Sequence, residues 1–180
     1  MATVITHAIA AGALSTIAPR ALPRARLALT LAILSAAPDV DVIGLHYGIA
    51  YGDQLGHRGF THSILFAVIA AFVAPFIAFP RIPRLSRTWW ILVWLLFVAT
   101  VSHGILDAFT DAGLGIGFFI PFDDTRYFAP WRPLATSPLS IDAFVNGPAG
   151  QILIIELIWV GLPLAGFLGL WHFTRWRRGR

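Results

Sequence analysis

The chain of 180 residues contains no cysteine and no lysine, and it has a single glutamate. The absence of cysteine excludes disulfides and thiolate metal ligands, so a metal ion would have to be held by histidine or carboxylate side chains. Charged residues make up 12% of the chain, against about 25% in ordinary soluble domains. Hydrophobic residues make up 57%, and the mean hydropathy is +0.74. This composition predicts an integral membrane protein.

Five apolar segments are suited to helices, and breaks that contain proline and arginine separate them. They cover residues 2–18, 27–37, 62–79, 89–110 and 151–173. The last three approach the roughly 20 residues needed to cross a bilayer, whereas the second is short for a span. No linker and no internal repeat divides the chain. We therefore predict one all-α domain over residues 1–180, a polytopic membrane helical bundle with about five transmembrane helices, or with four and a re-entrant segment.

The thirteen basic residues are all arginines, and five spans divide them unevenly between the two faces. Ten lie on one face: Arg20, Arg24, Arg26, Arg81, Arg84, Arg87, Arg175, Arg177, Arg178 and Arg180. Only Arg58, Arg126 and Arg132 lie on the other. Because arginine is enriched in cytoplasmic loops, we expect the Arg-rich loops and the C-terminus inside and the N-terminus outside. The net charge of +4 is then explained by lipid headgroups, and no nucleic-acid partner is expected.

Histidines and carboxylates gather at the outer ends of the predicted spans. They are His7 in the first, Asp39 and Asp41 after the second, His57 and His62 before the third, His103 and Asp107 in the fourth, and Glu156 in the fifth. Ionisable groups at membrane depth are costly unless they are paired or face a polar cavity. His103 and Asp107 are four residues apart, which places them on one helix face. The set predicts two or three divalent metal ions, with zinc preferred and manganese or iron compatible.

Each of these residues also has a simpler interpretation. A histidine such as His7, alone in an apolar helix, is more often a packing residue, and Asp39 and Asp41 can satisfy chain ends beside a proline. Thr61 is expected to be the N-cap of the helix that follows, with Ser63 in its first turn. The coincidence of several ligand types at one depth is what favours a metal site.

Several motifs occur together along the first two thirds of the chain. They are His7, PDVD at 38–41, HRGFTHS at 57–63, SHGILDAFTDAG at 102–113 and PF at 121–122. On these motifs the chain resembles the bacterial membrane-bound metal-dependent hydrolases of the YdjM type, which are distantly similar to zinc-dependent phospholipase C and zinc-dependent single-strand nucleases. The resemblance implies an inner-membrane protein that uses zinc to cleave phosphoesters. The ligands that it implies are His7, Asp39, His57, His62, His103 and Asp107, with Asp41 as a further candidate.

The expected reaction is hydrolysis of a phosphoester or ester in a lipid-like or anionic substrate, by metal-activated water at the extracytoplasmic face. Asp39 or Asp41 is expected to act as general base or bridging ligand. Arg58 is expected to bind the anionic substrate, or alternatively to pair with an aspartate of the site. The segment 111–150, rich in proline and aromatic residues, is expected to cover the site at the interface with membrane lipids.

Two other functions stay open at this point. The same histidines and aspartates are typical of a small transporter or channel for divalent cations or protons. A noncatalytic membrane interaction protein with a structural metal is the third possibility. The enzyme is favoured because the candidate ligands gather at one face, and the cytoplasmic half of the bundle offers no matching polar path beyond Glu156.

Overall fold

The structure, a computed structural model, describes residues 1–178, and of Ile141 only the backbone. Over these residues the protein is all-helical, as predicted, with two isolated β-bridges and no strands. The longer helices are α1 (Val4–Ala13), α2 (Arg24–Ala36), α4 (Ile64–Ala78), α5 (Arg87–Ala108), α7 (Ala149–Glu156) and α8 (Leu162–Arg178), and the short ones are α3 (Val42–His46) and α6 (Ile141–Val145).

Three continuous helical segments are long and apolar enough to cross a membrane: Arg24–His46, Arg87–Ala108 and Ala149–Arg178. Two shorter apolar helices, Val4–Thr16 and Ile64–Ala78, complete the bundle. The second span is longer than predicted, because a 3-10 segment, Ala37–Asp41, carries α2 directly into α3. Pro38 lies at the start of that segment, where its lack of an N–H group costs little.

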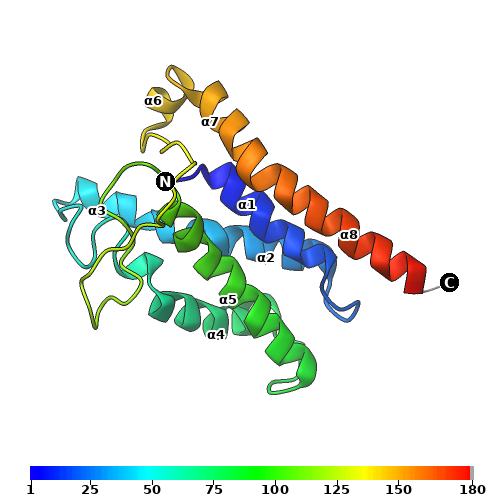
Figure 1. The fold of residues 1–180 in the computed structure, drawn as a ribbon. Helices are drawn as coiled ribbons and strands as arrows, with labels where there is room; N and C mark the ends of the chain where they lie inside the picture. The colour runs from blue at the N-terminus through cyan, green and yellow to red at the C-terminus, as the bar shows by residue number, and fades with distance from the viewer. Residues whose placement is uncertain (179–180) are drawn as a thin grey trace.

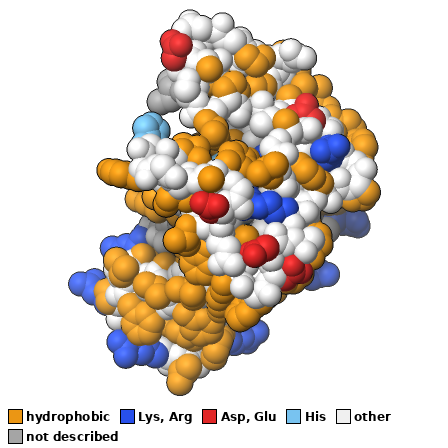
Figure 2. Space-filling view, turned by 90° about the vertical axis from the view of Figure 1, so that its left-hand side faces the viewer, with side chains coloured by type: hydrophobic (Ala, Val, Ile, Leu, Met, Phe, Trp, Pro, Cys, Tyr) orange, Lys and Arg blue, Asp and Glu red, His pale blue; other side chains and the backbone are white. Residues whose placement is uncertain are grey.

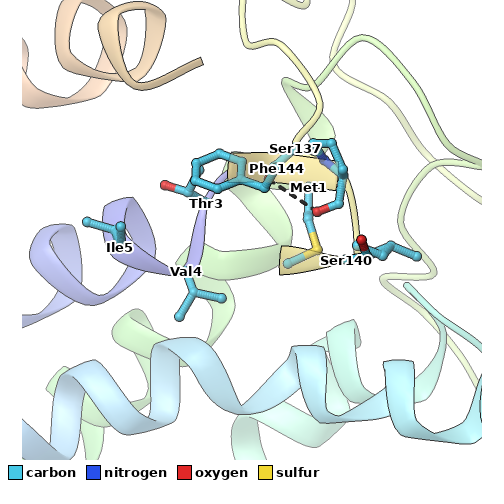
Figure 3. Close-up of a pocket in the computed structure, with 9 residues that line it drawn as sticks. Met1, Thr3, Val4, Ile5, Ser137, Ser140 and Phe144 are labelled. Carbon is cyan, nitrogen blue, oxygen red and sulfur yellow. Dashed lines mark hydrogen bonds between the residues drawn. The ribbon is translucent and has the colours of Figure 1, made fainter. Parts of the chain in front are cut away.

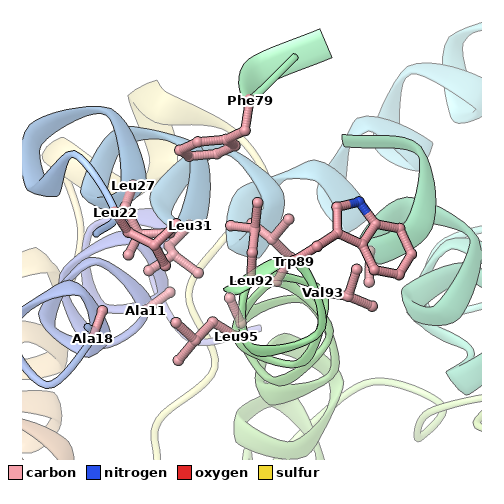
Figure 4. Close-up of a cluster of buried hydrophobic side chains, with 13 residues drawn as sticks. Ala11, Ala18, Leu22, Leu27, Leu31, Phe79, Trp89, Leu92, Val93 and Leu95 are labelled. Carbon is pink, nitrogen blue, oxygen red and sulfur yellow. The ribbon is translucent and has the colours of Figure 1, made fainter. Parts of the chain in front are cut away.

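The helices α1, α2, α4 and α5 form a bundle. Helices α7 and α8 form one continuous helical segment that lies along α1 (Figure 1). Helix α2 packs against both α1 and α5, and α4 packs against α5. An apolar core fills the space between them and includes Leu27, Leu31, Leu92 and Leu96, all fully buried (Figure 4). It lies mainly toward the start of α2 and the start of α5, away from the predicted site.

The two ends of the bundle carry different side chains. The starts of α1, α4 and α7 and the end of α5 lie at one end, together with α3 (Figure 1). The loops 19–23 and 79–86 and the end of α8 lie at the opposite end. Figure 2 looks onto the first of these ends: acidic side chains lie on the surface that faces the viewer, with some arginines among them, and other arginines appear along the outline of the molecule. The bundle therefore separates charge as the sequence predicted, and which end faces the cytoplasm stays a prediction.

The segment between α5 and α6 is irregular but well bonded. The N–H of Ala129 donates to Ala108 O (2.8 Å), at the end of α5, and the N–H of Ser137 donates to Met1 O (2.9 Å), ahead of α1. These bonds hold the segment across the end of the bundle where the predicted ligands lie.

Candidate metal centre

Four side chains converge at this end of the bundle, and we call them the ligand cluster: Asp39, His62, His103 and Asp107. Each offers one ligand atom, and all four atoms lie within 4.8 Å of one another. The two histidine Nε2 atoms are 3.1 Å apart, and Asp39 Oδ1 is 3.3 Å from His103 Nε2 and 3.7 Å from His62 Nε2. Asp107 Oδ2 lies 3.9 Å from both nitrogens. Bonds of about 2.1 Å to one tetrahedral ion would place ligand atoms about 3.4 Å apart, so these separations suit one ion.

The outer hydrogen bonds of the two imidazoles decide which nitrogen faces the cluster. His103 Nδ1 lies 2.6 Å from the carbonyl oxygen of Ser35, which only accepts, so Nδ1 carries the hydrogen. His62 Nδ1 lies 3.1 Å from Asp41 Oδ2, again an acceptor. Both Nε2 atoms therefore point into the cluster. Histidines that bind metal ions are commonly oriented in this way, with the other ring nitrogen donating a hydrogen bond to an acceptor outside the site. Two such lone pairs 3.1 Å apart repel each other unless a cation or a proton lies between them.

Three of the four carboxylate oxygens in the cluster accept no hydrogen bond from the protein. Both oxygens of Asp39 and Oδ2 of Asp107 are buried without a hydrogen bond, an arrangement that is rare and costly for acceptors. A divalent cation would satisfy all three oxygens. Two imidazole nitrogens and two carboxylates, with no thiolate, fit zinc and are compatible with manganese or iron.

A proton on His62 would supply positive charge to the cluster, besides that of Arg58. Burial alone lowers the pKa of His62, but the nearby carboxylates of Asp39 and Asp41 outweigh it and raise the pKa to about 9. A metal ion that binds Nε2 has to displace this proton.

Asp41 lies beside the cluster, and its carboxylate is already saturated with donors. It accepts from His57 Nδ1 (2.7 Å), Thr61 Oγ1 (2.6 Å) and the backbone N–H of Arg58 (3.2 Å), besides the contact with His62. Such a carboxylate orients histidine ligands from outside the metal shell. Asp41, His57 and His62 nevertheless offer three atoms within 4.8 Å of one another, a second group of ligand type.

Neither Thr61 nor Ser63 has the role predicted for it. Thr61 belongs to the 3-10 turn Phe60–His62 and donates to Asp41. Ser63 is the N-cap of α4, because its side chain accepts from the N–H of Phe66 at 3.1 Å. The prediction was wrong by two residues, because the 3-10 turn ends before the α-helix begins.

Arg58 is fully buried, and its guanidinium is engaged on three sides. Nε lies 3.6 Å from Asp107 Oδ2, while Nη1 donates to Ala112 O and Nη2 to Thr110 Oγ1, both at 2.8 Å. The residue has a φ of 65°, a strained conformation for a side chain of this size. Gly113 makes room for it, because a Cβ there would lie 2.5 Å from Nη1. Arg58 thus forms an ion pair with Asp107. This is the second of the two roles that the sequence predicted for it.

His7 and His57 lie around the ligand cluster. His7 Nε2 is 3.3 Å from Asp107 Oδ1, and its ring stacks on His103 with centroids 3.9 Å apart. His57 meets the ring of His62 edge-on at 5.5 Å and belongs to the second group rather than to the cluster, where it was predicted to reach His103 and Asp107. The structure thus brings together all the residues that the motifs implied, in the ligand cluster or directly around it, whereas Glu156 of the last span contacts Thr3 and Thr6 instead.

Two backbone groups complete the site, and no sequence pattern indicates them. The carbonyl of Ser35 orients His103, and the N–H of Ala2 donates to Asp107 Oδ1 at 2.7 Å. Backbone donors and acceptors are present at every position, so their use depends on the fold alone.

The family model for the YdjM inner membrane protein matches residues 1–177. The chain belongs to the YdjM family. It is 39% identical over 185 residues to Inner membrane protein YbcI of Escherichia coli (strain K12), with 99% of each chain covered. The comparison with solved structures gives no significant match. The resemblance drawn from the motifs is confirmed, and this YdjM-family chain is an inner membrane protein. The two names state no reaction.

Proposed function

We propose that this YdjM-family protein is a membrane-embedded metal-dependent hydrolase that cleaves a phosphoester or ester of a lipid-like or anionic substrate at the extracytoplasmic face. The observation that carries the proposal is the convergence of two imidazole nitrogens and two carboxylates, three of whose oxygens accept no hydrogen bond. Asp39 is the least buried member of the cluster: its side chain is 9% exposed, although both of its oxygens are buried, whereas the side chains of His62, His103 and Asp107 are fully buried. Because a catalytic metal site keeps one accessible position, a substrate would have to approach on the side of Asp39.

When bound, a divalent ion supplies Lewis acidity, which makes water nucleophilic near neutral pH and polarises the substrate oxygen. His62, His103 and Asp107 would hold the ion from the buried side. Asp39, the least buried of the four side chains and with an oxygen to spare, would accept the proton of the attacking water. Asp41 would act by orienting His62, and Arg58 by fixing Asp107.

A second ion, if the reaction uses one, would bind at Asp41, His57 and His62. These atoms are within ligand distance of one another, but His57 and His62 would have to lose to solvent the hydrogens that they donate to Asp41, since Asp41 has to stay a carboxylate to bind the ion. The count of two or three ions predicted from the sequence therefore stays a proposal.

A lipid-like substrate is supported by a cavity beside the cluster (Figure 3). Its volume is about 250 Å³, and apolar side chains form much of its lining, among them Met1, Val4, Leu139 and Phe144. Ala2, which bonds to Asp107, lies between the lining residues Met1 and Thr3. Ala2 therefore connects the wall of the cavity to Asp107, a candidate ligand. The cavity offers room for the apolar part of a substrate.

Transport is less well supported by the same structure. Among the described residues, the fully buried ionisable side chains lie at the site end of the bundle, and the apolar core fills the space beyond them. Glu156, the buried carboxylate of the last span, accepts hydrogen bonds from Thr3 and Thr6 of the N-terminal segment. These contacts do not connect it to a chain of proton-carrying groups.

The test is metal analysis of protein purified in detergent without chelator, with a hydrolysis screen over phospholipids, isoprenoid phosphates and phosphodiesters. We expect bound zinc, manganese or iron and one hydrolysed substrate class, both lost in His103→Ala. His172→Ala, which changes an exposed histidine at the far end of α8, is the matched control and should keep both. Wild-type protein without metal contradicts the proposal. Retained metal without hydrolysis contradicts it too, and ion flux in liposomes would then indicate transport.

A further inference from the structure

Glu156 is a buried carboxylate in a helix that is otherwise largely exposed. It is 1% exposed, and only 11% of an 18-residue apolar window within the span Ala149–Arg178 is buried inside the protein. Apart from Glu156, Ile152 is the only residue of the described span that is buried. An ionisable side chain at such a position is costly unless it is paired, and it commonly has a function.

The partners of Glu156 all come from the start of α1. The backbone N–H and the hydroxyl of Thr3 both donate to its carboxylate, and so does Thr6 Oγ1 at 2.7 Å. Thr3 is the N-cap of α1, so a carboxylate from another helix binds the positive end of α1, where negative charge is stabilised. Glu156 therefore fixes α1 and the residues before it.

Those residues reach the ligand cluster directly. The N–H of Ala2 donates to Asp107 Oδ1, while the next N–H, that of Thr3, donates to Glu156. Two successive amides thus bridge carboxylates of α5 and α7. His7, in the second turn of α1, also contacts Asp107 Oδ1. With Oδ1 held by these two donors, Oδ2 is left to face His62 and His103.

The helix geometry changes at the same place. Residues Leu157–Gly161, directly after Glu156, form a π-helical turn between α7 and α8. Such turns are rare and occur frequently at functional sites. This one lies where the last span meets α1.

We propose that Glu156 is a positioning residue for the metal centre: by holding Thr3 it fixes Ala2 and α1, and through them the orientation of Asp107. The proposal rests on the proposed function in one respect, that the cluster binds a metal ion. It gives the last span a role at a site to which it contributes no ligand.

The test compares the metal affinity of Glu156→Ala and Glu156→Gln with that of the wild type, by zinc titration against a competing chelator in detergent. We expect an affinity loss of about tenfold in Glu156→Ala, as for outer groups that orient ligands. Glu156→Gln should lose less, because its amide oxygen still accepts from Thr3 N–H. Leu157→Ala, at an exposed neighbour, is the matched control and should bind zinc as the wild type does.

The outcomes separate this inference from the proposed function. Wild-type protein that binds no zinc overturns both. Wild-type affinity in Glu156→Ala overturns the positioning role alone, even if the variant unfolds at a lower temperature. If Glu156→Ala does not fold, Thr6→Val removes one donor and leaves Glu156 in place. It should weaken zinc binding by about twofold or more, and unchanged affinity would then overturn the proposal.

Discussion

Asp39 and Asp41 are two positions apart, yet their carboxylates meet different surroundings. The oxygens of Asp39 have no hydrogen-bond partner, whereas those of Asp41 accept from a hydroxyl, a backbone amide and two imidazoles. The 3-10 geometry of Ala37–Asp41 explains the difference, because residues two apart at three per turn point in different directions. One carboxylate is thereby free to bind an ion, and the other orients ligands.

Asp41→Asn tests this division of roles. The change keeps the shape of the side chain but removes the charge that orients His57 and His62, so metal affinity should fall by about 10- to 100-fold. Titration with zinc in detergent measures it. Asp124→Asn, an exposed aspartate of the outer segment, should have no effect. An Asp41→Asn variant with wild-type affinity would show that Asp41 does not act on the site.

At the scale of elements, the short turn Phe60–His62 and the start of α4 contain two neighbouring hydroxyl residues with different functions, one for the site and one for the helix. Ser63 satisfies a backbone donor of the helix, and Thr61 satisfies a carboxylate of the site. Both are hydroxyl residues next to His62, so the sequence alone cannot separate them. Their hydrogen bonds do.

Two substitutions should separate these tasks experimentally. Ser63→Ala removes a helix cap and should lower the free energy of unfolding by about 1 kcal/mol, with metal affinity unchanged. Thr61→Val removes the hydrogen bond to Asp41 and should lower metal affinity with a smaller effect on stability. Thermal unfolding in detergent and zinc titration measure the two quantities. If Thr61→Val mainly lowered stability and Ser63→Ala mainly lowered metal affinity, Thr61 would be the helix cap.

At the scale of the whole molecule, the helical bundle and the membership of the site were predictable. Apolar runs indicate spans because backbone in lipid must be helical, and costly ionisable groups at one depth indicate a common site. The length of the second span was not predictable, because Pro38 begins a 3-10 segment there instead of ending the helix. Nor was the direction of Arg58, which depends on its positive φ and on the space beside Gly113.

The orientation of the bundle is open to a direct test, because the natural chain has no cysteine to remove. Phe122→Cys and Leu85→Cys place single thiols at exposed positions near opposite ends of the bundle. If the Arg-rich end is cytoplasmic, a membrane-impermeant maleimide should label Phe122→Cys in spheroplasts and Leu85→Cys only after lysis. The reverse labelling would invert the predicted topology.

The apolar core between the ligand cluster and the Arg-rich end has a consequence for the direction of any reaction at the cluster. Leu27, Leu31, Leu92 and Leu96 close the interior on that side, and a charged or hydrated product cannot cross such packing at a useful rate. Whatever reaches the cluster from the end of the bundle at which it lies must leave at that same end. Turnover at this centre would therefore deposit its products, and the protons released with them, on one side of the membrane only.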